Sequence, residues 1–211
     1  MTRKKLKNSP PKTIGRPTLG DALVKRLKED LETDLALCIP QIIRRYPTPK
    51  TPQDIKNALV GEFNVIEIPI QPSRESNPIP MTFVMPRNKN YSSKTLRHLA
   101  GMAEMRWQLH AFKQEWKVLP AFRADWEFPD HRPDAYWENK KGTIAIEWDA
   151  GRHDQNELKS KAIAFQEYYD AQIWGCATKM RTNNLIRVFK QNKINVKVIY
   201  APWHEGKITT I

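Results

Sequence analysis

The sequence has little cysteine and no long hydrophobic run. Its two cysteines, Cys38 and Cys176, lie far apart among apolar residues, so we expect reduced thiols and neither a disulfide nor a zinc site. No apolar run approaches the roughly 18 residues that a membrane span needs. The basic N-terminus also lacks the apolar stretch of a signal peptide. These absences predict a cytoplasmic protein that has no membrane partner.

Acidic residues are scarce relative to basic ones. The 211 residues include 35 Lys and Arg against 23 Asp and Glu, which gives a net charge of +12. An excess of this size favours a polyanionic partner, either nucleic acid or an anionic membrane surface. Because apolar anchoring segments are missing, the membrane is the weaker option, and we expect the partner to be DNA.

Residues 1–20 contain no acidic side chain, but they contain six basic ones and three prolines. This composition predicts a disordered basic arm. Within the arm, Gly15-Arg16-Pro17 resembles the core of an AT-hook, which reads the minor groove, so Arg16 is a candidate DNA contact. The alternative is a solvated tail that is attracted to phosphates.

Apolar residues with a helical period begin near residue 21, where leucines recur every fourth position and Asp21 is the expected N-cap. A later helix is predicted over residues 52–62, with Thr51 as its cap and Pro52 in the first turn. Residues 64–70 and 81–85 are typical of strands joined by a long polar loop.

The order of helix, short helix, helix and two-stranded hairpin predicts a winged helix-turn-helix domain over residues 21–90. In such a domain the helix at 52–62 would enter the major groove. Its exposed polar residues could then reach base edges or phosphates: Gln53, Lys56 and Asn57. The alternative is a small α+β domain on which these are ordinary solvated positions.

Tryptophan is absent from the first half of the chain, because all seven lie after residue 106, whereas most of the sixteen prolines lie before residue 87. This shift predicts a domain boundary at residues 86–92 and a second domain over 91–211. The elements predicted for it are a helix at 93–117, strands at 118–126, 134–138 and 143–149, a helix at 155–169, a strand at 171–178, a helix at 182–191 and a strand at 194–201. The fold class is therefore α/β or α+β, with the order αβββαβ followed by αβ.

The most apolar part of this second half, residues 134–149, contains four carboxylates, of which Asp134, Glu147 and Asp149 form the group of interest. The runs 134–138 and 143–149 flank a four-residue loop, Asn139 to Gly142. Such a loop predicts a β-hairpin in which Glu138 lies opposite Thr143.

Counting back along both strands puts Asp134 opposite Glu147, and the alternation of side chains places Asp149 on the same face. The tryptophans and isoleucines go to the other face. Opposed acids repel each other, so something must offset the repulsion. Either a divalent cation with oxygen ligands or a neighbouring lysine would do so. The candidate lysine is Lys161, about two turns into the helix that follows, and the alternative is an ordinary surface lysine.

These patterns resemble two related groups of proteins. The order αβββαβ, with an acid on the second strand and Glu-x-acid on the third, resembles the PD-(D/E)XK nuclease superfamily, whose core has a mixed sheet. Within it, the chain resembles the replication-relaxation family of plasmid and phage proteins, which similarly joins a winged-helix region to a nuclease-like fold. The motifs that carry this resemblance are Pro133-Asp134, Ile146-Glu147-x-Asp149-x-Gly151, Leu158-x-x-Lys161, Tyr168 and the segment His98 to Glu104.

The resemblance implies a DNA-binding, nuclease-like protein of a bacterial mobile element. Asp134, Glu147 and Asp149 would hold Mg²⁺ or Mn²⁺, as one ion or two, and Lys161 would orient the attacking water or stabilise charge on the phosphate. Asp149 stands where the superfamily has its lysine, and Lys161 could supply that group from the following helix. Glu104 is a candidate extra ligand, with a solvent-facing position as the alternative.

Three functions fit these features. The first is a metal-dependent DNA endonuclease, which Lys161 favours. The second is a non-cleaving DNA-binding protein of replication or mobilisation, which the missing Glu-x-Lys favours. The third is a protein-interaction module whose arm binds DNA incidentally. We expect the endonuclease, in the bacterial cytoplasm, as a homodimer or with partner proteins of a replication, mobilisation or transposition complex.

Overall fold

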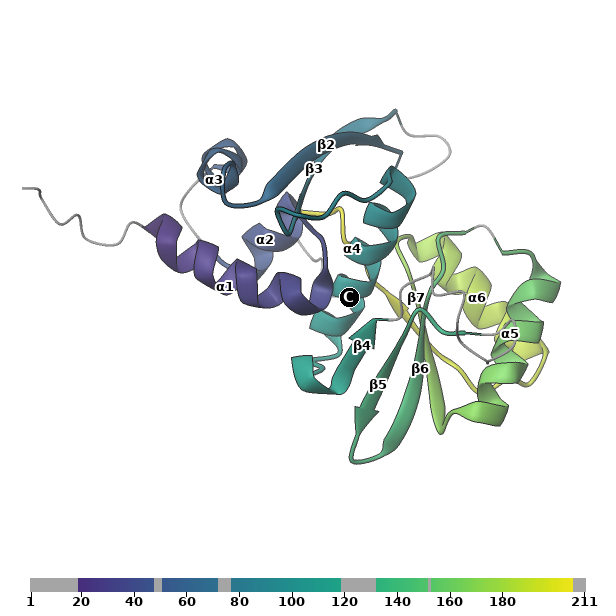
Figure 1. Ribbon diagram of the computed structural model, residues 1–211. Coiled ribbons are helices and arrows are strands. Elements are labelled where there is room, and N and C mark those ends of the chain that lie inside the picture. The colour runs from purple at the N-terminus through teal and green to yellow at the C-terminus, as the bar shows by residue number, and fades with distance from the viewer. Residues whose placement is uncertain (1–18, 48–50, 72–76, 119–131, 152, 207–211) are drawn as a thin grey trace, which may run out of the picture.

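The computed structural model describes residues 19–47, 51–71, 77–118, 132–151 and 153–206 (Figure 1). The described part is a mixed α/β structure with six α-helices and two sheets. The basic arm and its Arg16, and the strand predicted beyond residue 118, lie outside the described residues. No helix in the described ranges combines the length and the hydropathy that a membrane span requires.

The first half of the chain contains three helices and a small antiparallel sheet. Its elements are α1 (Leu19–Asp34), β1 (Leu37–Cys38), α2 (Ile39–Arg45), α3 (Pro52–Leu59), β2 (Asn64–Ile70) and β3 (Ile79–Met85). The strand order is β1-β3-β2, so β2 is an edge strand. The helix α1 begins at Leu19, which places Asp21 in its first turn and not at the N-cap as predicted.

The second half is built around a five-stranded mixed sheet. Its elements are α4 (Ser93–Gln108), a short 3-10 helix η1 (Lys113–Glu115), β4 (Trp116–Val118), β5 (Ala135–Asn139), β6 (Gly142–Trp148), α5 (Gln155–Tyr168), β7 (Ala171–Cys176), α6 (Lys179–Gln191) and β8 (Lys197–Tyr200). The strand order is β4-β5-β6-β7-β8, antiparallel up to β6 and parallel from there. Helix α4 packs on one face of the sheet, while α5 and α6 cover the other (Figure 1).

Helix α4 ends nine residues earlier than predicted. His110 takes a left-handed conformation with φ of 52°, the N–H of Ala111 donates to the Arg106 carbonyl, and the His110 N–H donates to that of Trp107. These two bonds form a Schellman motif, which ends a helix and usually has glycine at the left-handed residue. Because histidine stands there, the sequence carries no recognisable stop signal.

The β5–β6 hairpin has the predicted pairing and a shorter turn. Glu138 pairs with Thr143, as predicted, but Asn139 also pairs with Gly142, so only two residues form the turn. Gly142 has φ of +116°, and a Cβ there would lie 2.2 Å from the Asp170 carboxylate. Glycine is therefore needed at this position both for its backbone conformation and for space.

The two halves share one hydrophobic core. The cluster that joins the β2–β3 hairpin, α4 and the larger sheet includes Phe83, Met85, Leu99, Ile146 and Trp203, all buried. Trp137, Ile144 and Trp148 also pack into this cluster, so the predicted apolar face of the β5–β6 hairpin is confirmed. The other face of the sheet, with Ala145 and Trp174, forms a separate core under α5 and α6.

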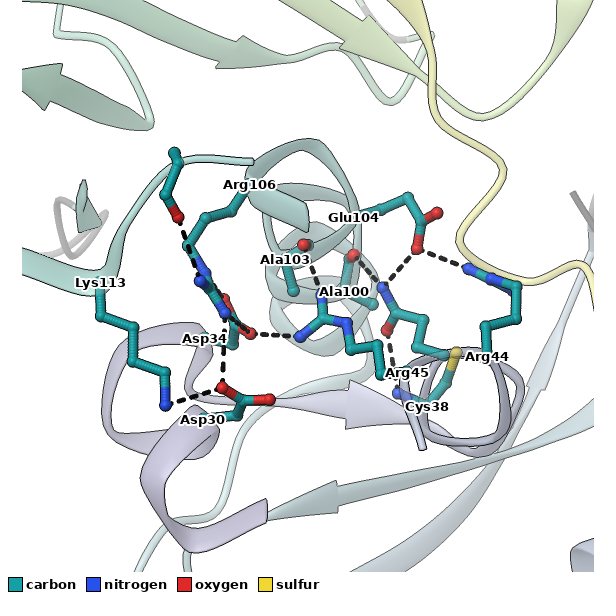
Figure 2. A network of polar contacts seen from close by, with 12 residues as sticks. Asp30, Asp34, Cys38, Arg44, Arg45, Ala100, Ala103, Glu104, Arg106 and Lys113 are labelled. Carbon is teal, nitrogen blue, oxygen red and sulfur yellow. Dashed lines mark hydrogen bonds and ion pairs between the residues drawn. The ribbon is translucent and has the colours of Figure 1, made fainter. Parts of the chain in front are cut away.

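Buried ion pairs add to the contact between α1, α2 and α4 (Figure 2). The Asp34 side chain is fully buried and accepts hydrogen bonds from Arg106, at 2.6 and 2.7 Å, and from Arg45 at 2.5 Å. Two residues before Arg106 on α4, Glu104 accepts hydrogen bonds from Arg44 at 2.6 Å and from Gln41 at 3.0 Å. Breaking a pair of this kind leaves an uncompensated buried charge, which typically costs about 3–5 kcal/mol.

Candidate functional site

The three predicted carboxylates lie at one end of the large sheet, where β5 begins and β6 ends. Asp134 directly precedes β5, Glu147 is the penultimate residue of β6, and Asp149 directly follows β6. The charges of Asp134 and Asp149 both act on Glu147, so the three carboxylates lie near one another. Lys161, from α5, also reaches this cluster.

Glu147 is almost fully buried, with 2% of its side chain exposed. Its Oε1 accepts a hydrogen bond of 2.6 Å from the Lys161 ammonium, while its Oε2 is buried and has no hydrogen-bond partner. Burial, and then the charge of Asp134, raises the pKa of Glu147 well above its usual value, against the opposing effect of Lys161. Burial alone would lower the pKa of Lys161, but Glu147 and Asp134 outweigh it and raise that pKa.

The two carboxylate oxygens of Asp134 have different partners. Its Oδ2 accepts a 2.7 Å hydrogen bond from the backbone N–H of Trp148, which ties the start of β5 to the end of β6. Its Oδ1 lies 3.1 Å from Nε2 of His98 on α4. His98 was not predicted as a site residue, although it opens the His98-to-Glu104 segment that contributed to the family resemblance.

Asp149 has partners that neither of the other two carboxylates contacts. Its fully buried carboxylate forms a short ion pair with Arg181 at the start of α6, and its Oδ1 accepts a 2.9 Å hydrogen bond from the Gly151 N–H. Arg181 also donates to the His153 carbonyl at 3.1 Å. Arg181 comes 32 residues after Asp149, so only the parallel pairing of β6 with β7 brings it here.

The carboxylates of this cluster differ in whether their oxygens are free to bind a cation. In the described ranges, no group of three or more His, Cys, Asp and Glu side chains has the spacing to hold a metal ion. Both oxygens of Asp149 already have donors, whereas Glu147 Oε2 has none. A buried carboxylate oxygen without a donor fits a cation, so Glu147 is the candidate ligand by this criterion. Asp134 would have to share its oxygens with the Trp148 N–H and His98.

The other predicted site residues lie elsewhere. Gln53 and Asn57 are exposed on α3 and bonded to each other at 2.8 Å, and Lys56 is half-exposed and pairs with Glu67 of β2 at 2.9 Å. For Glu104, the alternative of a solvent-facing position was wrong, because this side chain is fully buried and pairs with Arg44. Cys38 and Cys176 are buried free thiols, and burial raises the pKa of Cys38 to about 12.

Fold and site together define a mixed α/β protein in which a helical, hairpin-containing region shares a core with a sheet that carries buried carboxylates. Residues 81–183 match the family model for the replication-relaxation family. The matched range is just under half of the chain, and it contains α4, the three carboxylates, Lys161 and Arg181. The resemblance seen in the sequence is thus supported over this range. None of the curated proteins compared with the chain matches it.

Proposed function

We propose that the chain is a DNA-binding protein of mobile-element replication or mobilisation, and that Asp134, Glu147 and Lys161 carry out Mg²⁺-dependent hydrolysis of a DNA phosphodiester. The family match over residues 81–183 supports the replication-related role. The observation that carries the proposed chemistry is the Glu147 carboxylate: one oxygen binds Lys161 and the other is buried without a donor beside a second carboxylate.

Each residue of the cluster would have a separate role in such a reaction. Mg²⁺, when bound, would lower the pKa of a water molecule and polarise the phosphate. Asp134 and Glu147 would hold the ion, and the Trp148 N–H and His98 fix the orientation of Asp134. Lys161, which keeps its proton because its pKa is raised, would orient the water or stabilise charge on the phosphate. In this proposal Asp149 serves to position Arg181.

The first half of the chain supports the DNA-binding part of the proposal. The order α1-β1-α2-α3-β2-β3, with a three-stranded sheet, corresponds to that of a winged helix-turn-helix domain. Thr51 caps α3 by accepting the Asp54 N–H, and the hairpin follows α3 as predicted. With Ile55 and Leu59 buried, α3 presents Gln53 and Asn57 outward, where a base-reading helix would carry its contacts.

A second function, a non-cleaving DNA-binding protein on the same scaffold, is favoured by a specific observation. Two of the three carboxylates already have cationic partners, since Lys161 pairs with Glu147 and Arg181 with Asp149. Such pairs can offset the repulsion between the acids without a metal ion. If this is the function, Lys161 is structural and its replacement destabilises the fold without any effect that depends on Mg²⁺.

Nicking of a supercoiled plasmid, with Mg²⁺ or Mn²⁺ and with EDTA, distinguishes the two functions. The endonuclease predicts nicking that needs the ion and that both Glu147→Gln and Lys161→Met abolish. Glu138→Gln is the matched control, because this acid lies on the same hairpin and pairs with Lys117 at its far end. Binding without nicking by the wild type, together with melting temperatures that Mg²⁺ does not raise, would reject the endonuclease and support the scaffold.

Binding of duplex DNA is tested separately. The double variant Lys56→Gln, Asn57→Ala should bind more weakly than the wild type and melt at nearly the same temperature, because Asn57 is exposed and a surface pair such as that between Lys56 and Glu67 contributes little to stability. Lys25→Gln on α1 removes an exposed cation from another helix and serves as the control. Equal binding by all three proteins would show that α3 is not the reading helix.

A further inference from the structure

The segment that connects the β2–β3 hairpin to α4, and continues into that helix, is basic throughout. Residues 77–103 contain no acidic side chain, and a stretch of eleven of them contains Arg87, Lys89, Lys94 and Arg97. The first three are exposed and Arg97 is half-exposed. A surface segment whose charges are all positive attracts a negatively charged partner.

Two hydrogen bonds place this segment along the unpaired edge of β2. The side-chain amide of Asn64, the first residue of β2, donates to the Lys89 carbonyl at 2.8 Å. The Arg97 guanidinium donates to the carbonyl of Pro69, near the end of β2, at 3.2 Å. The segment therefore runs back beside the hairpin for the length of β2 before α4 carries the chain away (Figure 1).

The ends of this basic segment meet the two features of the proposed function. At one end, the charge of Arg87 acts on Glu62, three residues beyond the end of α3. At the other end, His98 directly follows Arg97, and its Nε2 lies 3.1 Å from Asp134 Oδ1. The four cations thus lie between the helix proposed to read DNA and the carboxylates proposed to cleave it.

The cations of the segment have no acidic partners in the described ranges, unlike three lysines elsewhere in the molecule. Lys28 pairs with Glu62, Lys56 with Glu67 and Lys117 with Glu138. By contrast, none of the four side chains of the segment forms an ion pair with any carboxylate of the described ranges. Phosphates would therefore bind them without displacing a carboxylate of the described ranges.

We propose that Arg87, Lys89, Lys94 and Arg97 form a phosphate-binding track for duplex DNA, which carries the backbone from α3 to Asp134. This inference rests on the proposed function. The seven residues of β2 span about 20 Å at about 3.3 Å per residue. At about 3.4 Å per nucleotide, that length corresponds to about six base pairs between the bases read by α3 and the phosphate at the carboxylates.

The test compares the salt dependence of duplex binding in two charge-matched double variants. Lys89→Gln, Lys94→Gln removes two exposed cations of the track. Lys140→Gln, Lys141→Gln removes two exposed cations from the β5–β6 turn, at the opposite end of the hairpin from Asp134. The slope of log K against log salt is negative, and each lost phosphate contact reduces its magnitude by about 0.9. The magnitude should therefore fall by about 2 in the track variant and should not change in the control. Circular dichroism confirms that both variants are folded.

The outcomes separate this inference from the function on which it rests. If the wild type fails to bind duplex DNA at low salt, the proposed function fails and the track fails with it. If the wild type binds and the track variant keeps the wild-type slope, or loses no more than the turn variant does, the track is wrong while DNA binding stands. A selective loss in the track variant supports the inference.

Discussion

Two replacements of Asp134 separate the hydrogen bond that this carboxylate accepts from the charge that it carries. Its Oδ2 accepts the Trp148 N–H at 2.7 Å, and its charge is the main reason, after burial, that the pKa of Glu147 is raised. Asp134→Asn retains an oxygen that can accept the N–H and removes the charge. Asp134→Ala removes both, so the N–H of Trp148, itself a buried residue, loses its acceptor.

The magnitudes follow from these two contributions. Losing a hydrogen bond to a charged acceptor costs about 1.5–3 kcal/mol of unfolding free energy. Relief of the cross-strand repulsion with Glu147 returns about 0.2–1 kcal/mol. Asp134→Ala should therefore be about 2 kcal/mol less stable than the wild type. Asp134→Asn exchanges a charged bond for a neutral one and should stay within about 1 kcal/mol of the wild type.

Urea unfolding in EDTA measures both variants without interference from cations. A second series with Mg²⁺ tests the proposed site, because an ion present at 100 times its Kd would stabilise the wild type by about 2.7 kcal/mol. Neither variant should show this gain. An alanine variant as stable as the asparagine variant would refute the role of the Trp148 hydrogen bond, and an equal Mg²⁺ gain in all three proteins would refute the metal site.

Three further outcomes are expected, each measured by urea unfolding. Asp34→Ala should lose about 3–5 kcal/mol, because it leaves the buried Arg45 without a carboxylate partner and Arg106 with only the 3.8 Å pair to Asp30. Asp21→Ala, at an exposed position of α1, should lose far less. Gly101→Ala should lose at least about 1–3 kcal/mol, because its Cβ would lie 2.2 Å from the Trp148 ring; a stable variant would show that α4 shifts freely. The pKa of Glu147 is raised by burial and then by Asp134, so this residue favours the folded state below its usual value of 4.5, and the contribution is lost as the pH rises through the raised pKa. Glu147→Gln in EDTA should therefore gain stability relative to the wild type as the pH rises from acid to mildly basic, and a difference independent of pH would contradict the raised pKa.

The carboxylate cluster was predictable because its geometry is local. The Asn139–Gly142 turn sets the register of the hairpin, and period-two alternation then assigns Asp134 and Glu147 to one face. Lys161 was within reach of sequence reasoning because it lies on the helix that directly follows, 14 residues from Glu147.

The partners that were missed come from distant parts of the chain. His98 and Arg181 reach the cluster only because α4 packs under the sheet and β7 lies parallel to β6. Glu104 was missed for a related reason, since an acid on an amphipathic helix is usually solvated, and here α2 packs over it with Arg44 and Gln41. The left-handed conformation of His110, which ends α4, was missed because glycine is the residue that usually marks this position.

Helix α4 belongs equally to both halves of the molecule. One side binds α1 and α2 through Glu104 and Arg106, and the other contacts the large sheet, with Gly101 against Trp148 and Met105 against Gly175. A gene fragment cut at residues 86–92 would therefore yield a second half whose first helix exposes a buried acid and a buried arginine to water. The two halves of the chain therefore cannot be exchanged independently. A replacement for the first half would have to supply cations opposite Glu104 and an acid opposite Arg106. Recombination between relatives should succeed only where α1, α2 and α4 are inherited together.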